Sequence, residues 1–385
     1  MLAFGSRPPP HLGATPSLAS VRVGLVCPYS LTIPGGVQGQ VMGLARALRE
    51  LGHDVRVLAP CDGPPPDAGV TPLGRSVPTA ANGSVAPLAP DPSAQLRTIR
   101  ALRDEAFDLV HLHEPIAPGP CMTATLFADA PKVGTFHAAG ESAGYRAMGW
   151  ALKRLARRLD HRVAVSPDAM ALAQGALGGD YELLFNGIEV ERFATGPAHP
   201  TDGPTIFFLG RHEPRKGLDV LLAAMADVPP DVRLWVGGDG PQHQELRERH
   251  AGDGRIEWLG RISDEERAAR MRGCTVYCSP SVRGESFGMV LLEAMASGCA
   301  LVASDLAGHR NVATDEVDAL LAPVGDAPAL AKALCRVLDD EVLRQALVAG
   351  GRQRADELSM HRLAERYAEV YEMVIDRRGA AGSRR

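Results

Sequence analysis

The sequence lacks the long apolar run that a membrane-spanning helix requires. No segment approaches about 18 uninterrupted apolar residues, so a transmembrane protein is not predicted. Residues 1–20 are rich in proline and small residues and lack the continuous apolar core of a signal peptide, so we expect a disordered extension there. The seven cysteines are odd in number and scattered, which does not suggest a disulfide framework and favours a cytoplasmic protein.

Motifs for two kinds of site are also missing. There is no Gly-x-Gly-x-x-Gly fingerprint, which counts against a dehydrogenase, and no Asp-x-Asp motif is placed to carry Mg²⁺. Cys274 and Cys278 lie in a predicted strand, where core packing is favoured over metal ligation. His111 and His113 share one face of another predicted strand without an apparent third ligand, so packing is favoured there as well. We therefore predict no metal site, no bound cofactor and no nucleic-acid partner.

Short apolar runs alternate with amphipathic stretches along most of the 385 residues, a length that suggests two domains. Buried strands are predicted at 21–26, 55–58, 109–112, 132–136 and 162–165, and a second series at 205–210, 232–238, 255–260, 275–280 and 300–304. A proline- and glycine-rich break at 194–205 separates the two series. The alternation predicts an α/β fold of two Rossmann-like domains, whose parallel sheets face each other across a cleft.

Ligands of such sheets bind beyond the carboxyl ends of the strands, so the loops after the strands are the candidate sites. After the first strand, Pro34-Gly35-Gly36 leads into a helix whose first N–H groups are free to bind an anion, although a tight turn explains the glycines equally well. In the second domain, Arg211, Arg215 and Lys216 follow a strand in "RHEPRKG". Their charges suit a diphosphate, with solvated surface charge as the alternative.

Several phrases in a fixed order carry a resemblance to a known family. "PGGVQ", "HLHEP", "GTFH", "FNGIEVERF", "GRHEPRKG" and "ESFGMVLLEAMASG" resemble glycosyltransferase family four, of GT-B architecture, over about residues 21–371. Within that family, "VGLVCPYS", "NGSVA" and "GESFG" resemble the branch that transfers mannose from GDP-mannose to phosphatidylinositol. Other family-four enzymes, which use a GDP- or UDP-sugar and a soluble acceptor, are the alternative. A GT-B-like epimerase or an inactive sugar-nucleotide-binding protein is a more distant one.

The resemblance implies a domain plan. The first domain would span 21–198 and hold the acceptor, and the second would span 199–360 and hold the nucleotide sugar. The helix predicted at about 361–378 would return to the first domain, and residues 379–385 would form a disordered tail.

The same resemblance implies the donor-binding residues. They are Gly36, Arg211, Arg215, Lys216, Ile262, Asp264, Glu285 and Glu293. Arg211 and Lys216 would neutralise the diphosphate, and the Gly36 N–H would approach it from the other domain. The base would lie against Ile262 and Asp264.

Catalysis is also implied by the resemblance. Glu293 would hold the ribose and Glu285 the hydroxyls of the donor sugar, whereas a lone acidic pair of this spacing is otherwise helix surface. The anomeric configuration would be retained through an oxocarbenium-like, same-face attack, in which Arg211 and Lys216 stabilise the departing diphosphate. His137, in "GTFH", would lie near the reacting carbon.

Acceptor binding is implied at Tyr29, Gln38, Asn82 and His137, which match positions around the inositol ring. Because the acceptor would be a lipid, contact with an anionic membrane is expected. Residues 145–162 combine basic with apolar side chains, a pattern that is typical of surface-lying helices and nearly as typical of a solvated helix face. Residues 93–107 repeat the pattern more weakly. We expect a cytoplasmic protein that is peripheral to the inner face of the membrane.

Overall fold

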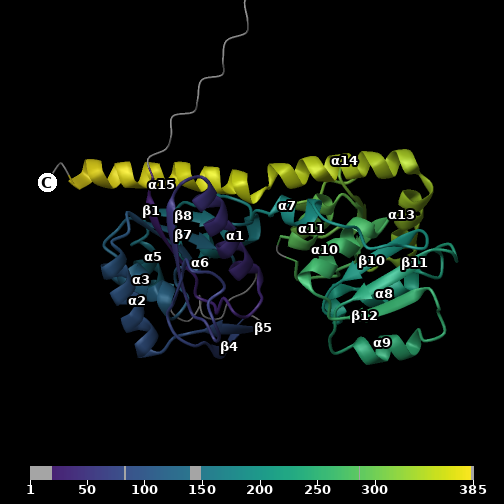
Figure 1. The fold of residues 1–385 in the computed structure, drawn as a ribbon, viewed down its shortest axis with the longest axis horizontal. Coiled ribbons are helices and arrows are strands. Elements are labelled where there is room, and N and C mark those ends of the chain that lie inside the picture. The colour runs from purple at the N-terminus through teal and green to yellow at the C-terminus, as the bar shows by residue number, and fades with distance from the viewer. Residues whose placement is uncertain (1–19, 82–83, 139–148, 286, 383–385) are drawn as a thin grey trace, which may run out of the picture.

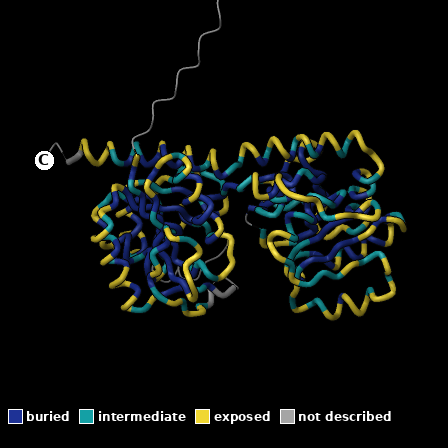
Figure 2. Tube along the Cα trace, viewed as in Figure 1, coloured by how far each residue is buried: buried dark blue, intermediate teal, exposed yellow. Residues whose placement is uncertain are grey.

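Two lobes make up the protein in the computed structural model, which describes residues 20–81, 84–138, 149–285 and 287–382 (Figure 1). The extension predicted at 1–20 lies, except for Ser20, outside the described residues. Each lobe has a parallel sheet between helices, and the most buried chain segments run through the centre of each lobe (Figure 2). The predicted α/β fold with two Rossmann-like domains is confirmed.

The N-terminal sheet has the strand order β3-β2-β1-β6-β7-β8-β9, with all neighbours parallel. These strands span Val70–Pro72, Asp54–Ala59, Arg22–Val26, Leu109–His113, Lys132–Phe136, His161–Ala164 and Glu182–Leu183. Every residue of β6 and β7 is buried, as their continuous apolar runs predict for strands covered on both faces. An antiparallel hairpin of β4 (Val77–Ala81) and β5 (Ser84–Leu88) stands apart from this sheet.

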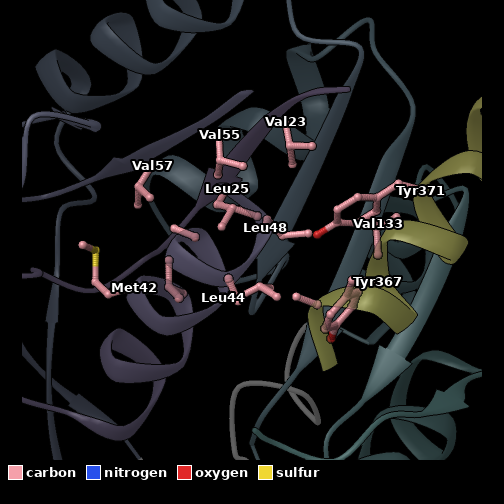
Figure 3. Close-up of a cluster of buried hydrophobic side chains, with 14 of the residues drawn as sticks. Val23, Leu25, Met42, Leu44, Leu48, Val55, Val57, Val133, Tyr367 and Tyr371 are labelled. Carbon is pink, nitrogen blue, oxygen red and sulfur yellow. The ribbon is translucent and has the colours of Figure 1, made fainter. Parts of the chain in front are cut away.

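Helices cover both faces of the N-terminal sheet. They are α1 (Gly36–Glu50), α2 (Pro92–Glu105), α3 (Pro120–Phe127), α5 (Gly149–Ala156), α6 (Pro167–Leu177) and α15 (Met360–Gly382). One core cluster joins α1 and α15 to the sheet, and a second joins α2, α3, α5 and α6 to its other face. Figure 3 shows Tyr367 and Tyr371 of α15 among Val133, Leu44 and Leu48 in the first cluster.

The C-terminal sheet has the strand order β12-β11-β10-β13-β14-β15, again all parallel. These strands span Ile256–Gly260, Arg233–Gly237, Thr205–Leu209, Val276–Ser279, Ala300–Ser304 and Leu320–Ala322. The helical elements of this lobe are α7 (Val190–Ala194), η1 (Pro214–Lys216), α8 (Leu218–Ala224), α9 (His243–Arg249), α10 (Asp264–Gly273), α11 (Met289–Ser297), α12 (Ala307–Arg310), α13 (Ala327–Asp339) and α14 (Glu341–Glu357).

The chain crosses between the lobes at two adjacent places. Ile188 pairs with Ser359, its N–H donates to the Leu358 carbonyl at 2.9 Å, and its own carbonyl accepts from Met360 at 2.8 Å. Since α7 packs on α10 and α11, the first crossing comes earlier than the predicted boundary at residue 198. The second crossing leads into α15, which lies along the N-terminal lobe (Figure 1) and continues past residue 379, where a disordered tail was predicted.

Strand order reverses once in each sheet, between β1 and β6 and between β10 and β13. Loops leave in opposite directions at such a point, which opens a crevice beyond the carboxyl ends of the strands. Apart from Asn82, which lies outside the described residues, the predicted site residues follow β1, β7, β10, β12 and β13. The topology therefore places the loops that carry them around these two crevices.

Candidate active site

An open pocket of about 680 Å³ lies where the two lobes meet. From the N-terminal lobe it is lined by the loop after β1 and the start of α1, which include the predicted residues Gly36 and Gln38. From the C-terminal lobe it is lined by α10 and α11, which include the predicted Asp264 and Glu293. The pocket thus brings together residues that the sequence assigned to donor and acceptor from both domains.

The N terminus of α1 points its unpaired amides at this region. Gly35 precedes the helix with extended backbone, and no side chain caps the first turn. Gly36 is exposed, and a β-carbon there would meet nothing within 4 Å, so there is open space beside the first turn of this 15-residue helix. Because the N-terminal end of a helix has a partial positive charge, it favours an anion.

Gln38 holds the loop that leads into this helix. Its side-chain amide donates to the carbonyl of Ile33 at 3.2 Å and more weakly to that of Ser30 at 3.4 Å. A β-carbon at Gly35 would lie 2.3 Å from the Gln38 Oε1, so a larger residue there would displace the Gln38 side chain from this position. The structure therefore gives Gln38 a structural contact in addition to its predicted place at the acceptor.

Two loops of the C-terminal lobe are fastened together at the carboxyl ends of β10 and β13. Gly217 has a φ of +66°, and a β-carbon there would lie 2.0 Å from the Pro280 carbonyl oxygen. The N–H of Val282 donates to the Arg215 carbonyl at 2.8 Å. These contacts between the two loops place Lys216 beside Glu285, with 2.5 Å between Nζ and Oε1.

Glu285 is ionised in this setting. Burial raises the pKa of its carboxyl group, but the Lys216 ammonium and the Ser281 hydroxyl, which donates at 2.9 Å, together hold that pKa below its ordinary value. Lys216 and Glu285 are both mostly buried, with side chains 21% and 12% exposed. The pair is therefore a fixed cation and anion side by side, which suits a ligand that carries both phosphate and hydroxyl groups.

The arginines of the same loop have an acidic partner that was not predicted from the sequence. Glu213 lies between them, 3.6 Å from Arg211 Nε and 2.6 Å from Arg215 Nε. Arg211 is 66% exposed, so its guanidinium is free to reorient toward a ligand. The sequence did not predict Glu213 as a partner, because its contacts with both arginines depend on the conformation of this loop.

A second charged cluster lies at the predicted ribose position. Burial raises the pKa of Glu293, although Arg267 lies 3.3 Å away and lowers it. Arg267 also contacts Asp264 at 3.3 Å, and Asp264 pairs with Arg192 near the crossing between the lobes. Arg267 was missed in the sequence, because its i,i+3 spacing from Asp264 looks like any exposed helix pair.

Of the remaining predicted residues, Tyr29 and His137 lie in the N-terminal lobe and Ile262 in the C-terminal lobe. Tyr29 packs on the first core cluster and bridges to Leu88, and burial raises the pKa of its hydroxyl group. His137 follows β7, and its ring nitrogen Nε2 is 2.9 Å from His113 Nδ1. Ile262 is partly buried against a core cluster of the C-terminal lobe that contains Trp235 and Leu291. Asn82 lies outside the described residues.

The histidines that the sequence assigned to packing do have packing partners. His111 Nδ1 is 2.7 Å from the Tyr371 hydroxyl, and its Nε2 is 2.7 Å from Thr135 Oγ1. Cys274 and Cys278 are buried free thiols in the C-terminal core. Within the described ranges, no group of three metal-ligating side chains is placed to hold an ion. In the same ranges, no helix has the length and apolarity needed to span a bilayer.

Comparisons with known proteins agree with this architecture. Residues 34–192 match the family described as Glycosyltransferase Family 4, and residues 203–340 match the one described as Glycosyl transferases group 1. Solved structures share the fold over more than nine tenths of the chain. Sucrose-phosphate synthase from Thermosynechococcus elongatus has a TM-score of 0.72 at 21% identity, covering 92% of this chain and 99% of its own. WaaG, a glycosyltransferase of lipopolysaccharide biosynthesis, has a TM-score of 0.63 at 18% identity, covering 91% and 99%.

Fold and family matches together define a glycosyltransferase of GT-B architecture. Curated relatives narrow the class. Phosphatidyl-myo-inositol mannosyltransferase of Mycolicibacterium smegmatis is 41% identical over 92% of this chain and 94% of its own. The enzyme of the same name from Propionibacterium freudenreichii is 38% identical over 83% and 87%. The chain belongs to the phosphatidyl-myo-inositol mannosyltransferase family, as the resemblance in its motifs predicted.

Proposed function

We propose that this enzyme transfers mannose from GDP-mannose to the inositol ring of phosphatidylinositol, at the cytoplasmic face of a membrane and with retained configuration. The observation that carries the proposal is the 38 to 41% identity, along most of the chain, to relatives named for phosphatidyl-myo-inositol. The charged pocket between the lobes supports it, because a nucleotide sugar combines an anionic diphosphate with many hydroxyl groups.

In this proposal the diphosphate lies between the two lobes. The open amide at Gly36 approaches it from α1, and Arg211, Arg215 and Lys216 approach it from the β10 loop. Charge builds on the departing phosphate as the sugar leaves, so cations held in place before the reaction lower the barrier without reorganising. The pairing of Lys216 with Glu285 at 2.5 Å supports this role, because it fixes the ammonium in a mostly buried position.

Sugar and nucleoside would be held by the two buried carboxyl groups. Glu285 accepts from mannose hydroxyls on the side away from Lys216, and Glu293 accepts from the ribose. Arg267 keeps Glu293 paired at 3.3 Å and so favours the charged, accepting form of a group that burial would otherwise neutralise. The guanine base would lie against Ile262 and Asp264 at the start of α10.

The acceptor would enter from the N-terminal lobe. Tyr29, Gln38, Asn82 and His137 carry polar groups suited to a ring of hydroxyls. The inositol hydroxyl then attacks the anomeric carbon from the face that the diphosphate leaves, through an oxocarbenium-like transition state. The bond from that carbon to the phosphate oxygen breaks, and the departing phosphate oxygen takes the proton of the attacking hydroxyl. His137 is the side chain that we place beside the reacting carbon.

Membrane contact is supported by the exposed face that α2, α3 and α5 form together. These helices pack side by side and expose large apolar side chains at Leu96, Phe127 and Trp150, the last being 81% exposed. Basic side chains stand beside them at Lys153 and Arg154 on α5. On α2 the basic charge is weaker, because Asp104 pairs with both Arg100 and Arg103. Apolar side chains flanked by basic ones are typical of a surface that binds anionic lipid.

The test is GDP release from GDP-mannose by the purified protein with different acceptors. Phosphatidylinositol vesicles, soluble inositol phosphate and simple sugars are offered separately, and UDP-glucose replaces the donor in a parallel series. We expect release above the hydrolysis background only with GDP-mannose and the vesicles. Strong release with a soluble acceptor, or with UDP-glucose, would assign the chain to a different reaction of the family.

A further inference from the structure

The predicted catalytic residue His137 is in contact with a second, buried histidine, His113. His113 ends β6 and His137 follows β7, the neighbouring parallel strand. Their rings are stacked with centroids 5.2 Å apart, and His113 Nδ1 is 2.9 Å from His137 Nε2. His113 is 2% exposed and His137 is half-buried, so the contact is shielded from water on the His113 side. One of the two nitrogens must donate to the other.

The main chain around His137 is also fixed from this side. The Glu114 carboxylate oxygen Oε1 accepts from the N–H groups of His137 and Ala138, both at 2.6 Å. Glu114 has a φ of +54°, an uncommon conformation for a side-chain-bearing residue that aims its carboxylate at these amides. Both the backbone and the ring of His137 are therefore held by consecutive residues of one strand end.

The other nitrogen of His113 decides the direction of the hydrogen bond between the rings. His113 Nε2 is buried and has no hydrogen-bond partner among the described residues. If His113 accepted through Nδ1, its proton would sit on Nε2 as a buried donor without an acceptor. Buried N–H groups without an acceptor are rare in proteins, and unpaired acceptors are somewhat less so. The favoured arrangement has His113 donating from Nδ1 and its Nε2 carrying the lone pair.

We infer that His113 is a positioning residue, whose Nδ1–H bond to His137 Nε2 holds His137 in the tautomer with its proton on Nδ1. The inference rests on the proposed function for the catalytic part, since it assigns His137 a way of acting in that site. With Nε2 occupied, His137 presents Nδ1–H as a hydrogen-bond donor to a ligand and is not a general base. Burial supports a neutral ring, because it lowers the pKa of His137 to about 4.

The tautomer can be measured without any activity. Nitrogen-15 shifts of the histidine side chains in the full chain separate protonated from unprotonated ring nitrogens, and a His137→Asn variant assigns the signal. We expect His137 to be protonated on Nδ1 at neutral pH. A proton on Nε2, or rapid exchange between the two forms, would overturn the inference whether or not the enzyme transfers mannose.

Two substitutions test the consequence for transfer. The amide nitrogen of asparagine can occupy the position of His113 Nδ1, so His113→Asn keeps a donor, whereas His113→Leu removes it. We expect His113→Leu to lower kcat about 10- to 100-fold with little change in KM for the donor, and His113→Asn to recover most of that loss. The exposed His361 on α15 provides a matched control, His361→Leu, which we expect to leave kcat unchanged.

The outcomes separate the inference from the proposed function. If the wild-type protein forms no mannolipid, the proposed function is contradicted. The nitrogen-15 measurement of the His137 tautomer then still tests the positioning role of His113. Equal loss of kcat in His113→Leu and His113→Asn, with GDP binding and thermal midpoint unchanged, would show that the donated bond does not matter. If His113→Leu does not fold, the asparagine variant and the wild-type spectrum still decide the question.

Discussion

Replacing Lys216 with methionine should affect both transfer and stability, because the structure gives this ammonium two tasks. Methionine keeps the length and apolar stem of lysine and removes only the charge. Glu285, whose side chain is mostly buried, then keeps the hydrogen bond from the Ser281 hydroxyl at 2.9 Å but loses the positive charge beside it. Breaking a buried ion pair in this way costs about 3 kcal/mol of unfolding free energy. Loss of one preorganised cation at the departing phosphate raises the activation free energy by about 3 kcal/mol, which lowers kcat about 100-fold.

A double-mutant cycle with Glu285→Gln separates the two effects. Glutamine needs no counter-ion, so Lys216→Met should cost less stability in the Glu285→Gln background, with a coupling of about 1 to 3 kcal/mol by urea unfolding. Transfer should not recover in the double variant, because the phosphate still lacks its cation. Additive effects of the two substitutions on the free energy of unfolding would refute the ion pair. A wild-type kcat in Lys216→Met would refute the role of Lys216 at the phosphate.

The pH dependence of the same pair has a defined sign. The folded-state pKa of Glu285 lies below its ordinary value of 4.5, so the pair stabilises the fold fully above that pH. The contribution is lost as the pH falls through the lower, folded-state pKa. We therefore expect the stability difference between wild type and Lys216→Met to be largest near neutral pH and to shrink as the pH falls toward about 4, since the buried Glu285 of the variant is protonated first. A difference that grows on acidification would contradict this.

Three further predictions concern the donor, the ribose cluster and the membrane. Glu285→Ala should abolish most transfer while calorimetry still finds near-normal GDP binding, and equal losses for GDP and GDP-mannose would place Glu285 elsewhere. Arg267→Met should weaken GDP binding about tenfold, since it leaves the carboxyl group of Glu293 buried and favours its neutral form. Unchanged GDP affinity would exclude the cluster from the donor site. Trp150→Ala should reduce sedimentation with anionic vesicles without changing GDP binding, and equal sedimentation would remove α5 from the membrane face.

The sequence predicted the interior of both sheets, because short apolar runs that alternate with amphipathic helical patterns are compatible with few other folds. All ten strands expected from those runs are present. The strands that it missed lie at sheet edges or apart from the sheets: β3, β9 and β15 have only two or three residues each, too few to show a period. The β4–β5 hairpin contains Pro78 and Pro87, which weaken any strand pattern.

For the site, chain order predicted which loops come together but not which charges pair within them. Glu213, Arg267 and Glu114 were missed, since each acts through a contact set by turn geometry or by distant parts of the chain. His113 was assigned to packing, which its burial bears out, yet its ring contact with His137 depends on the register of β6 against β7. Such pairings require the three-dimensional register, which a single sequence does not specify.

Isolation of the lipid product directly tests the proposed transfer of mannose to phosphatidylinositol. The purified protein is incubated with GDP-mannose and vesicles that contain phosphatidylinositol, and the extracted lipid is analysed by mass spectrometry and nuclear magnetic resonance. We expect one added hexose on the inositol ring, with the α-configuration of the donor retained. A product with inverted configuration, or unmodified phosphatidylinositol beside mannose on a soluble acceptor, would contradict it.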